Sequence, residues 1–60
     1  MKTLYIYNLE TNLVVATATG KTNEECESKA YAYENDYGMT YTPAFGCTDG
    51  LVDDKEAEVL

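Results

Sequence analysis

The sequence has no histidine and no arginine, and its only cations are four lysines set against eleven carboxylates. Without histidine the chain cannot build a Ser–His or Cys–His pair, and it offers no imidazole to a metal ion. The two cysteines lie far apart in the sequence, and the lack of a CxxC pair argues against a zinc site. These absences remove the commonest catalytic groups, so no catalytic residue is assigned. Whether the chain is an enzyme stays open.

The shortage of cations also restricts the partners that the chain can bind. Its formal net charge is −7 at pH 7. Proteins that grip a phosphate backbone usually carry a basic stripe, and anionic membranes attract the same kind of surface. Four lysines cannot supply a large stripe, so the composition disfavours nucleic acids and membranes and favours a positively charged protein surface.

The short length is a further restriction, because sixty residues make only one domain. A chain of this size buries about 60% of its unfolded surface, and such chains are usually stabilised by disulfides, metals or oligomerisation. Residues 1–4 lead into tyrosines rather than an apolar signal segment, and no apolar run approaches the roughly 20 residues that span a bilayer. The expected location is the cytoplasm, where thiols stay reduced and oligomerisation becomes the favoured route to stability.

What the sequence does have is a stretch, residues 3–18, that is apolar at nearly every position outside its central turn. Residues 2–8 and 13–19 are predicted to form a β-hairpin, with Asn12 closing the turn in the left-handed conformation. A half-buried strand should alternate apolar with polar residues, because successive side chains point to opposite faces. This hairpin does not alternate in that way, so both of its faces are expected to be buried.

The predicted register assigns the side chains of the hairpin to two faces, with Ile6 near Ala16 and Leu4 near Ala18. The face expected to meet a helix carries small and aliphatic residues: Leu4, Ile6, Val14, Ala16 and Ala18. Only one helix is evident in the sequence, so the opposite face is predicted to meet a second copy of the chain. The residues of that predicted oligomer interface are Tyr5, Tyr7, Leu13 and Val15.

The tyrosines of this second face allow an alternative interpretation. Tyr5 and Tyr7 could form a stacking platform for single-stranded nucleic acid. Such platforms usually come with a cationic groove, which this composition cannot provide. Tyrosine is also enriched at protein interfaces, because it buries a large ring while its hydroxyl stays hydrogen-bonded, and this interpretation is preferred.

A capping box predicts where the helix begins: Thr22 accepts from the Glu25 amide, and the Glu25 side chain returns to the Thr22 amide. The helix is expected to run to about Tyr37, with Gly38 as its C-terminal stop. Its narrow apolar stripe is predicted to consist of Cys26, Ala30, Tyr33 and Tyr37. Cys26 is therefore interpreted as a small core residue.

The remaining strands are predicted from shorter signals. Residues 39–42 alternate and are expected to form a third strand, which residues 44–47 could continue after a bulge. Asp49-Gly50 predicts a turn, and residues 51–52 a short fourth strand returning beside the third.

The predicted fold class is α+β: a small antiparallel sheet of three to four strands, in the order β-β-α-β-β, with one helix packed on one face. Residues 1–52 are expected to form the single domain, and residues 53–60 an acidic, mobile C-terminal tail.

Carboxylates on the helix and in the tail make an expected acidic surface. Its members are Glu24, Glu27, Glu34, Asp53, Asp54, Glu56 and Glu58. The surface could imitate a nucleic-acid backbone and occupy a basic groove, or it could simply keep a small protein soluble. The carboxylates of the tail could also bind a divalent cation such as magnesium weakly, but the ligand spacing of an EF-hand is absent. No cofactor is therefore expected.

The chain resembles the small acidic proteins that phages and prophages encode against host defences, in particular compact Cas9-directed anti-CRISPR proteins. The resemblance covers the whole chain and includes residues 1–7, which open directly into a strand, and residues 22–26, which start the helix. One family of this group has a four-stranded antiparallel sheet crossed by a helix and resembles a transcriptional-coactivator fold that binds single-stranded DNA. That family forms homo-oligomers and nicks supercoiled DNA, which leaves a poorer target because negative supercoiling favours R-loop formation.

Three functional hypotheses follow. The leading one is a phage-derived inhibitor of a Cas9-like nuclease in a bacterial host cell, acting as a homo-oligomer through plasmid DNA topology or by acidic occupation of a basic groove. The first alternative is a non-enzymatic, homo-oligomeric protein-interaction module. The second is a single-stranded nucleic-acid-binding module.

Overall fold

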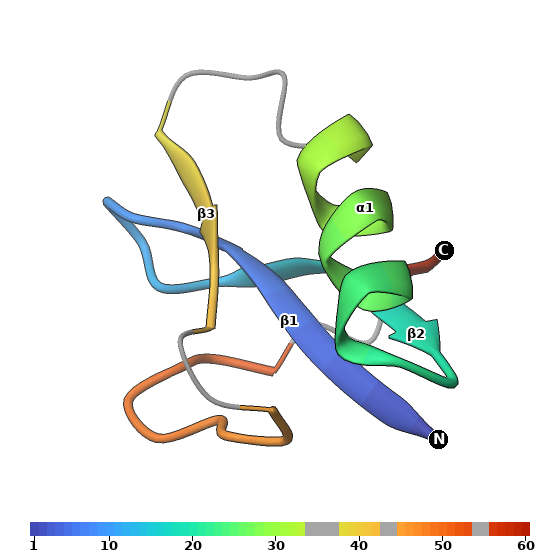
Figure 1. The fold of residues 1–60 in the computed structure, drawn as a ribbon. Helices are drawn as coiled ribbons and strands as arrows, with labels where there is room; N and C mark the ends of the chain where they lie inside the picture. Colours follow the sequence, from blue (N-terminus) through green and yellow to red (C-terminus); the bar gives the residue numbers. More distant parts are fainter. Residues whose placement is uncertain (34–37, 43–44, 54–55) are drawn as a thin grey trace.

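The computed structural model describes residues 1–33, 38–42, 45–53 and 56–60 (Figure 1). The strands in these residues are Lys2–Asn8 (β1), Val14–Gly20 (β2), Met39–Tyr41 (β3) and Glu58–Val59 (β4), and the helix is Asn23–Tyr33 (α1). The strands form one sheet in the order β3-β1-β2-β4. The predicted α+β class, a small sheet with one helix, is confirmed.

The turn of the β1–β2 hairpin follows from local chemistry. Asn12 has φ 58°, the left-handed conformation predicted for it, and asparagine tolerates this conformation better than most residues. Its N–H donates to the Asn8 carbonyl at 2.7 Å, and the Asn8 side-chain oxygen accepts from the Glu10 N–H at 2.8 Å. The predicted pairs are also confirmed: Ile6 lies opposite Ala16, and Leu4 opposite Ala18.

A β-bulge interrupts this register near the turn. Ile6 pairs with Ala16, but the next residue, Tyr7, pairs with Val14, so Val15 is an extra residue on β2. Cross-strand partners share a face of the sheet, which places Val14 on the face of Tyr7.

The bulge exchanges the faces that were predicted for the two valines. Val15 packs against the buried cluster beneath the helix, and Val14 lines a hollow with Tyr5 on the other face. The sequence assignment of both residues was therefore wrong. The physical reason is that a strand alternates with period two, so one inserted residue inverts every face beyond it.

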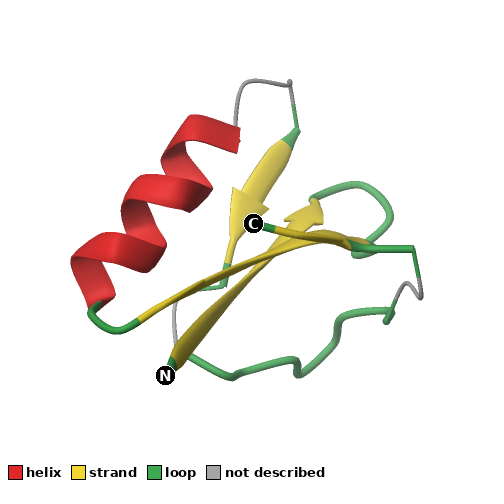
Figure 2. Cartoon of the chain, turned by 90° about the vertical axis from the view of Figure 1, so that its right-hand side faces the viewer, coloured by secondary structure: helices red, strands yellow, loops and turns green. Residues whose placement is uncertain are grey.

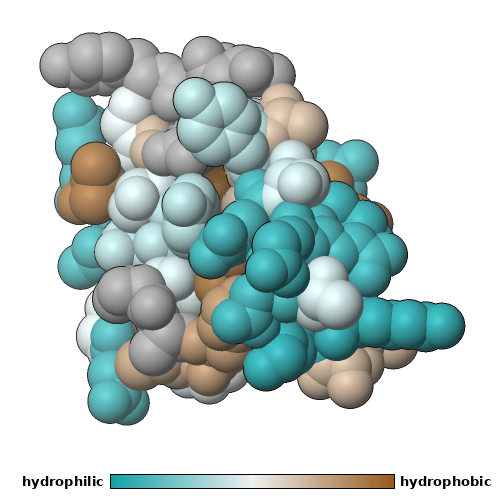
Figure 3. Space-filling model, in the orientation of Figure 1, coloured by the Kyte–Doolittle hydropathy of each residue, from teal (hydrophilic) through white to brown (hydrophobic). Residues whose placement is uncertain are grey.

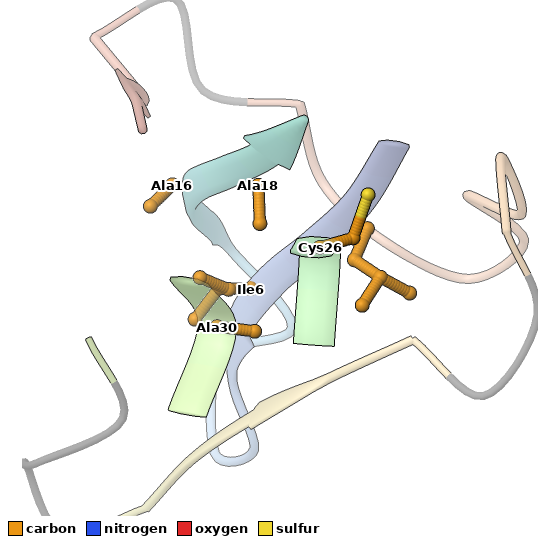
Figure 4. Close-up of a cluster of buried hydrophobic side chains, with 6 residues drawn as sticks. Ile6, Ala16, Ala18, Cys26 and Ala30 are labelled. Carbon is orange, nitrogen blue, oxygen red and sulfur yellow. The ribbon is translucent and has the colours of Figure 1, made fainter. Parts of the chain in front are cut away.

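The core joins the hairpin to the helix (Figure 4). Its buried members, each at most 1% exposed, are Leu4, Ile6, Ala16, Ala18, Cys26 and Ala30. Short alanine side chains on both sides let a helix lie close to the sheet. The Cys26 thiol also donates to the Lys2 carbonyl at 3.3 Å, so the predicted core role of this cysteine is confirmed.

The start of α1 is stabilised by a variant of the predicted capping box. The Glu25 N–H donates to the Thr22 hydroxyl at 3.2 Å, as expected. The Glu25 carboxylate, however, accepts from the Lys21 N–H at 2.8 Å rather than from the Thr22 amide. This hydrogen bond places the Glu25 side chain against Gly20. A Cβ added to Gly20 would lie 3.0 Å from the Glu25 Cβ and Cγ. The predicted end of the helix near Tyr37 lies outside the described residues.

Short segments cover the outer edge of β1. β3 pairs antiparallel with it, confirming the predicted third strand over Met39–Tyr41. Beyond β3, the Thr42 N–H donates to the Tyr5 carbonyl at 2.9 Å, and the Thr42 hydroxyl accepts from the Tyr5 N–H at 3.3 Å. The Gly46 N–H also donates to the Thr3 carbonyl at 3.0 Å. Residues 45–47 contain no strand, so the predicted continuation of the third strand is not found in them, and residue 44 lies outside the described residues.

The outer edge of β2 is covered by the segment that was predicted to be a mobile tail. Glu58 and Val59 form β4, which pairs parallel with β2, so the sheet is mixed rather than wholly antiparallel. The Leu60 N–H donates to the Thr17 carbonyl at 2.9 Å, and Leu60 packs against the core cluster. An uncovered strand edge leaves backbone groups unpaired, and this segment supplies partners for them. The predicted fourth strand at 51–52 is only an isolated bridge from Val52 to Leu13.

The dimensions of the chain agree with those of a compact domain of this length. Its accessible surface is 4129 Å², against about 3,900 Å² expected for 6.7 kDa. Its radius of gyration is 10.2 Å, against about 10.4 Å expected for this length. In the described part of the chain, no helix is long and apolar enough to cross a membrane.

Candidate binding surfaces

The face of the hairpin away from α1 is covered in part by residues 45–53 of the same chain (Figure 2). The Val14 N–H donates to the Val52 carbonyl at 3.0 Å, and the Val52 N–H donates to the Asn12 carbonyl at 2.8 Å. Val14 is left only 1% exposed. The premise that the helix is the only cover available within the chain was therefore wrong.

A partly open hollow of about 250 Å³ lies between this segment and the sheet. Tyr5 and Val14 line it from β1 and β2, and Thr48, Leu51 and Asp53 line it from the segment. Val14 is buried, whereas Thr48 and Asp53 are exposed, so the valine lies at the inner end and the two polar side chains at the mouth. The hollow thus combines an aromatic ring, aliphatic surface, a hydroxyl and a carboxylate.

The walls of the hollow are held by backbone hydrogen bonds. Both backbone polar groups of Tyr5 are bonded to Thr42, and the Val14 amide is bonded to Val52. Within the segment, the Leu51 N–H donates to the Thr48 carbonyl at 3.1 Å. A site on bonded strands and a closed turn needs little ordering when a ligand enters it.

The residues of the predicted oligomer interface are not all on one surface. Tyr5 lines the hollow, Tyr7 pairs with Val14, and Leu13 is bridged to Val52. Val15 packs against the core cluster and does not belong to this group. Val14 was missed as a member of the second face because two adjacent valines give no sequence signal of the bulge between their faces. The tyrosines are half-buried rather than open, and Asp53 lines the same hollow as Tyr5.

The described members of the predicted acidic surface are all exposed. They are Glu24, Glu27, Asp53, Glu56 and Glu58. Glu34 and Asp54 lie outside the described residues. The helix α1 lies on a side of the molecule that is largely hydrophilic in Figure 3. Asp53 lines the hollow with Tyr5 and Val14, and Asp49, in the same segment, is exposed. The negative charge therefore covers two sides of the molecule.

Two lysines are held against the fold. The Lys29 ammonium donates to the Thr19 carbonyl at 2.7 Å, and the Lys2 ammonium lies 5.4 Å from the centre of the Phe45 ring. A cation over an aromatic face is attracted by the ring, and a carbonyl at the end of a strand gains a donor. The sequence did not suggest either contact, because each joins segments that are distant in the chain. Lys21 is exposed, and Lys55 lies outside the described residues.

The described residues offer few groups arranged for catalysis or metal binding. Both cysteines are free thiols, Cys26 buried and Cys47 half-buried. Among residues 1–33, 38–42, 45–53 and 56–60, no group of three or more histidine, cysteine or carboxylate side chains is placed to hold a metal ion.

No family model matches the chain, and no curated protein or solved structure matches it either. Its function has to be inferred from its own residues.

Proposed function

We propose that this chain is a non-enzymatic inhibitor that enters a basic, nucleic-acid-binding groove of a partner protein as a monomer. The observation that carries the proposal is the exposure of carboxylates on two opposite sides of the sheet. Glu24 and Glu27 are exposed residues of α1, and Asp49 and Asp53 are exposed residues of the segment 45–53, which runs on the other side of the sheet in Figure 2. A nucleic acid in a groove likewise presents negative charge to both walls.

The placement of the lysines supports this proposal. The one lysine of α1, Lys29, is directed to the Thr19 carbonyl, and Lys2 lies over Phe45. The two ammonium groups thus contact a carbonyl and a ring, and the glutamates Glu24 and Glu27 of the helix stay exposed.

Screening by salt explains why the distribution of charge matters as much as its total. The Debye length is about 8 Å at physiological ionic strength. The chain measures 28 × 22 × 20 Å, so a partner on one side hardly senses charges on the other. Carboxylates on both sides are useful to a protein that is gripped from both sides, as in a groove.

Monomeric action is supported by the covered edges of the sheet. β3, Thr42 and Gly46 cover the outer edge of β1, and β4 with Leu60 covers that of β2. The strands left at the outside are only three and two residues long, which gives a second copy little backbone to pair with.

The proposed partner is a Cas9-like nuclease with its guide. The chain resembles Cas9-directed inhibitors, and such nucleases hold their heteroduplex in a positively charged channel. The purified chain should co-elute with a Cas9–guide complex and prevent its cleavage of target DNA. Raising the salt concentration should weaken both effects, because the contacts are largely ionic.

Three isosteric variants test the two-sided contact. Glu27→Gln removes a charge from the helix side and Asp49→Asn from the segment side, and each should weaken binding roughly two- to fivefold. Glu10→Gln, in the hairpin turn, is the matched control and should have a smaller effect. Equal weakening by all three variants would mean that only net charge matters, and failure to co-elute at low salt would remove the nuclease as the partner. If the chain alone converts supercoiled plasmid to open circles, the DNA-topology hypothesis replaces this one.

A further inference from the structure

The hollow beside Tyr5 includes Asp53, one of the exposed carboxylates of the proposed function, and its lining indicates what that carboxylate could meet. Its lining residues include an aromatic residue and an acid, Tyr5 and Asp53, together with Val14 and Leu51. These groups come from three separate stretches of the chain.

We propose that this hollow is a binding site for an arginine side chain supplied by the basic partner protein. This inference rests on the proposed function only in its choice of partner. The alkyl stem of arginine would lie against Val14 and Leu51, and its guanidinium group would meet Tyr5 and Asp53. Guanidinium stacks on aromatic faces and pairs with carboxylates through two parallel hydrogen bonds.

The volume of the hollow favours a side chain over a whole ligand. Pockets that enclose small molecules usually measure roughly 300–1,000 Å³, and this one measures about 250 Å³. A side chain that enters from a partner surface needs only such a space. Arginine is also one of the residues that most often anchor protein interfaces.

The chemistry of the lining selects among the possible side chains. An acidic side chain would be repelled by Asp53 and by the net charge of −7. A purely aliphatic one would leave the carboxylate and the Thr48 hydroxyl without new partners as it excluded water from them. Lysine could satisfy the carboxylate, but its compact and strongly hydrated ammonium gains less from the tyrosine ring than a planar guanidinium does.

The rigidity of the site adds to the argument. Tyr5 lies in the central strand β1 with its N–H and C=O both bonded to Thr42, and Val14 is fixed through Val52. An entering side chain therefore meets walls that are already in place, so little of the contact energy is lost in ordering them.

The test uses blocked arginine (N-acetyl-arginine amide) as the probe and the full chain as the receptor. Titration is followed by NMR at the methyl groups of Val14 and Leu51 and the ring of Tyr5. We expect saturable chemical-shift changes at these groups with a millimolar dissociation constant. This corresponds to a binding free energy on the order of −4 kcal/mol. Blocked citrulline, an uncharged isostere, should bind at least tenfold more weakly, and blocked lysine should bind more weakly than arginine.

Two substitutions locate the site. Asp53→Asn should reduce arginine binding about tenfold, whereas Asp49→Asn, an exposed acid of the same segment that does not line the hollow, should leave it unchanged. The proposal is overturned if the probe shifts acidic residues all over the surface without saturating at the hollow. It is equally overturned if Asp49→Asn weakens binding as much as Asp53→Asn, or if citrulline binds as well as arginine.

The results for the probe and for the nuclease are independent of each other. Saturable binding of arginine without co-elution of a Cas9–guide complex would keep the site and reject the partner. Co-elution without arginine binding would keep the partner and reject the site.

Discussion

The exchange of Val14 and Val15 between the two faces can be tested by removing their methyl groups. Val14 is 1% exposed, and Val14→Ala deletes two buried methyl groups at about 0.8 kcal/mol each, with a further term for the cavity. We expect a loss of about 2 kcal/mol. Val15 is only half-buried, so Val15→Ala should cost less, about 1 kcal/mol or below.

The bulge also specifies which neighbour each valine is coupled to. Val14 and Leu51 line the same hollow, so the double variant with Leu51→Ala should deviate from additivity by at least about 0.5 kcal/mol. Val15 packs on the other face, against the core cluster, and should be additive with Leu51 within roughly 0.3–0.5 kcal/mol.

Urea unfolding followed by far-UV circular dichroism measures all of these variants, because the chain contains no tryptophan to report by fluorescence. A domain of this size melts about 4–8 °C lower for each kcal/mol lost, so thermal melting gives a second measurement. If Val15→Ala proves the more damaging change, or if Val15 rather than Val14 couples to Leu51, the strands pair without a bulge. Val14 would then not line the hollow, and the hollow would lose its buried inner wall.

Three further predictions concern other parts of the fold. Gly20→Ala should destabilise the protein by about 1 kcal/mol, since the new Cβ would lie 3.0 Å from Glu25 Cβ and Cγ, and an unchanged melting temperature would contradict this close approach. Thr42→Val should cost about 1–3 kcal/mol, because the Tyr5 N–H loses its acceptor, and hydrogen exchange at that amide should accelerate; retained protection would show that another group accepts it. Light scattering at micromolar concentration should give the mass of one chain, 6.7 kDa, whereas a dimer would restore the predicted interface at Tyr5 and Tyr7.

Several features of the fold were predictable because their causes are local. Asn12 adopts the left-handed conformation within its own turn, and Thr22 accepts from an amide only three residues ahead. The register of Ile6 with Ala16 follows from that turn, since a closed hairpin leaves few other pairings. Cys26 and Ala30 are buried because a stripe at helical spacing must face the sheet.

The second face was predicted less well, because its cover comes from far along the chain. The Val52 hydrogen bonds to Val14 and Asn12 join segments about forty residues apart. Neither segment contains a sequence signal that predicts its pairing with the other. The acidic segment at the end of the chain was predicted to be a tail on the basis of its charge. It pairs with β2 because its backbone, like any backbone, can satisfy an open strand edge whatever its side chains carry.

The candidate site also has one feature that was predictable from the sequence and one that was not. Composition alone indicated a negative surface that suits a basic partner, because charge adds up without any knowledge of the fold. Which carboxylate would share a hollow with which tyrosine could not be predicted, since Tyr5 and Asp53 line one hollow only because residues 45–53 fold back onto the hairpin.

The sequence by itself determined the hairpin, the capped helix and the sign of the surface, because turns, caps and net charge depend on neighbours in the chain. Only the tertiary structure decided which valine faces the helix, which segment closes each edge of the sheet, and where a hollow is left. Those outcomes depend on contacts such as Tyr5 with Thr42 and Thr19 with Leu60, which span 37 and 41 residues. Such contacts form only when the whole chain has packed, so no short stretch of residues contains them.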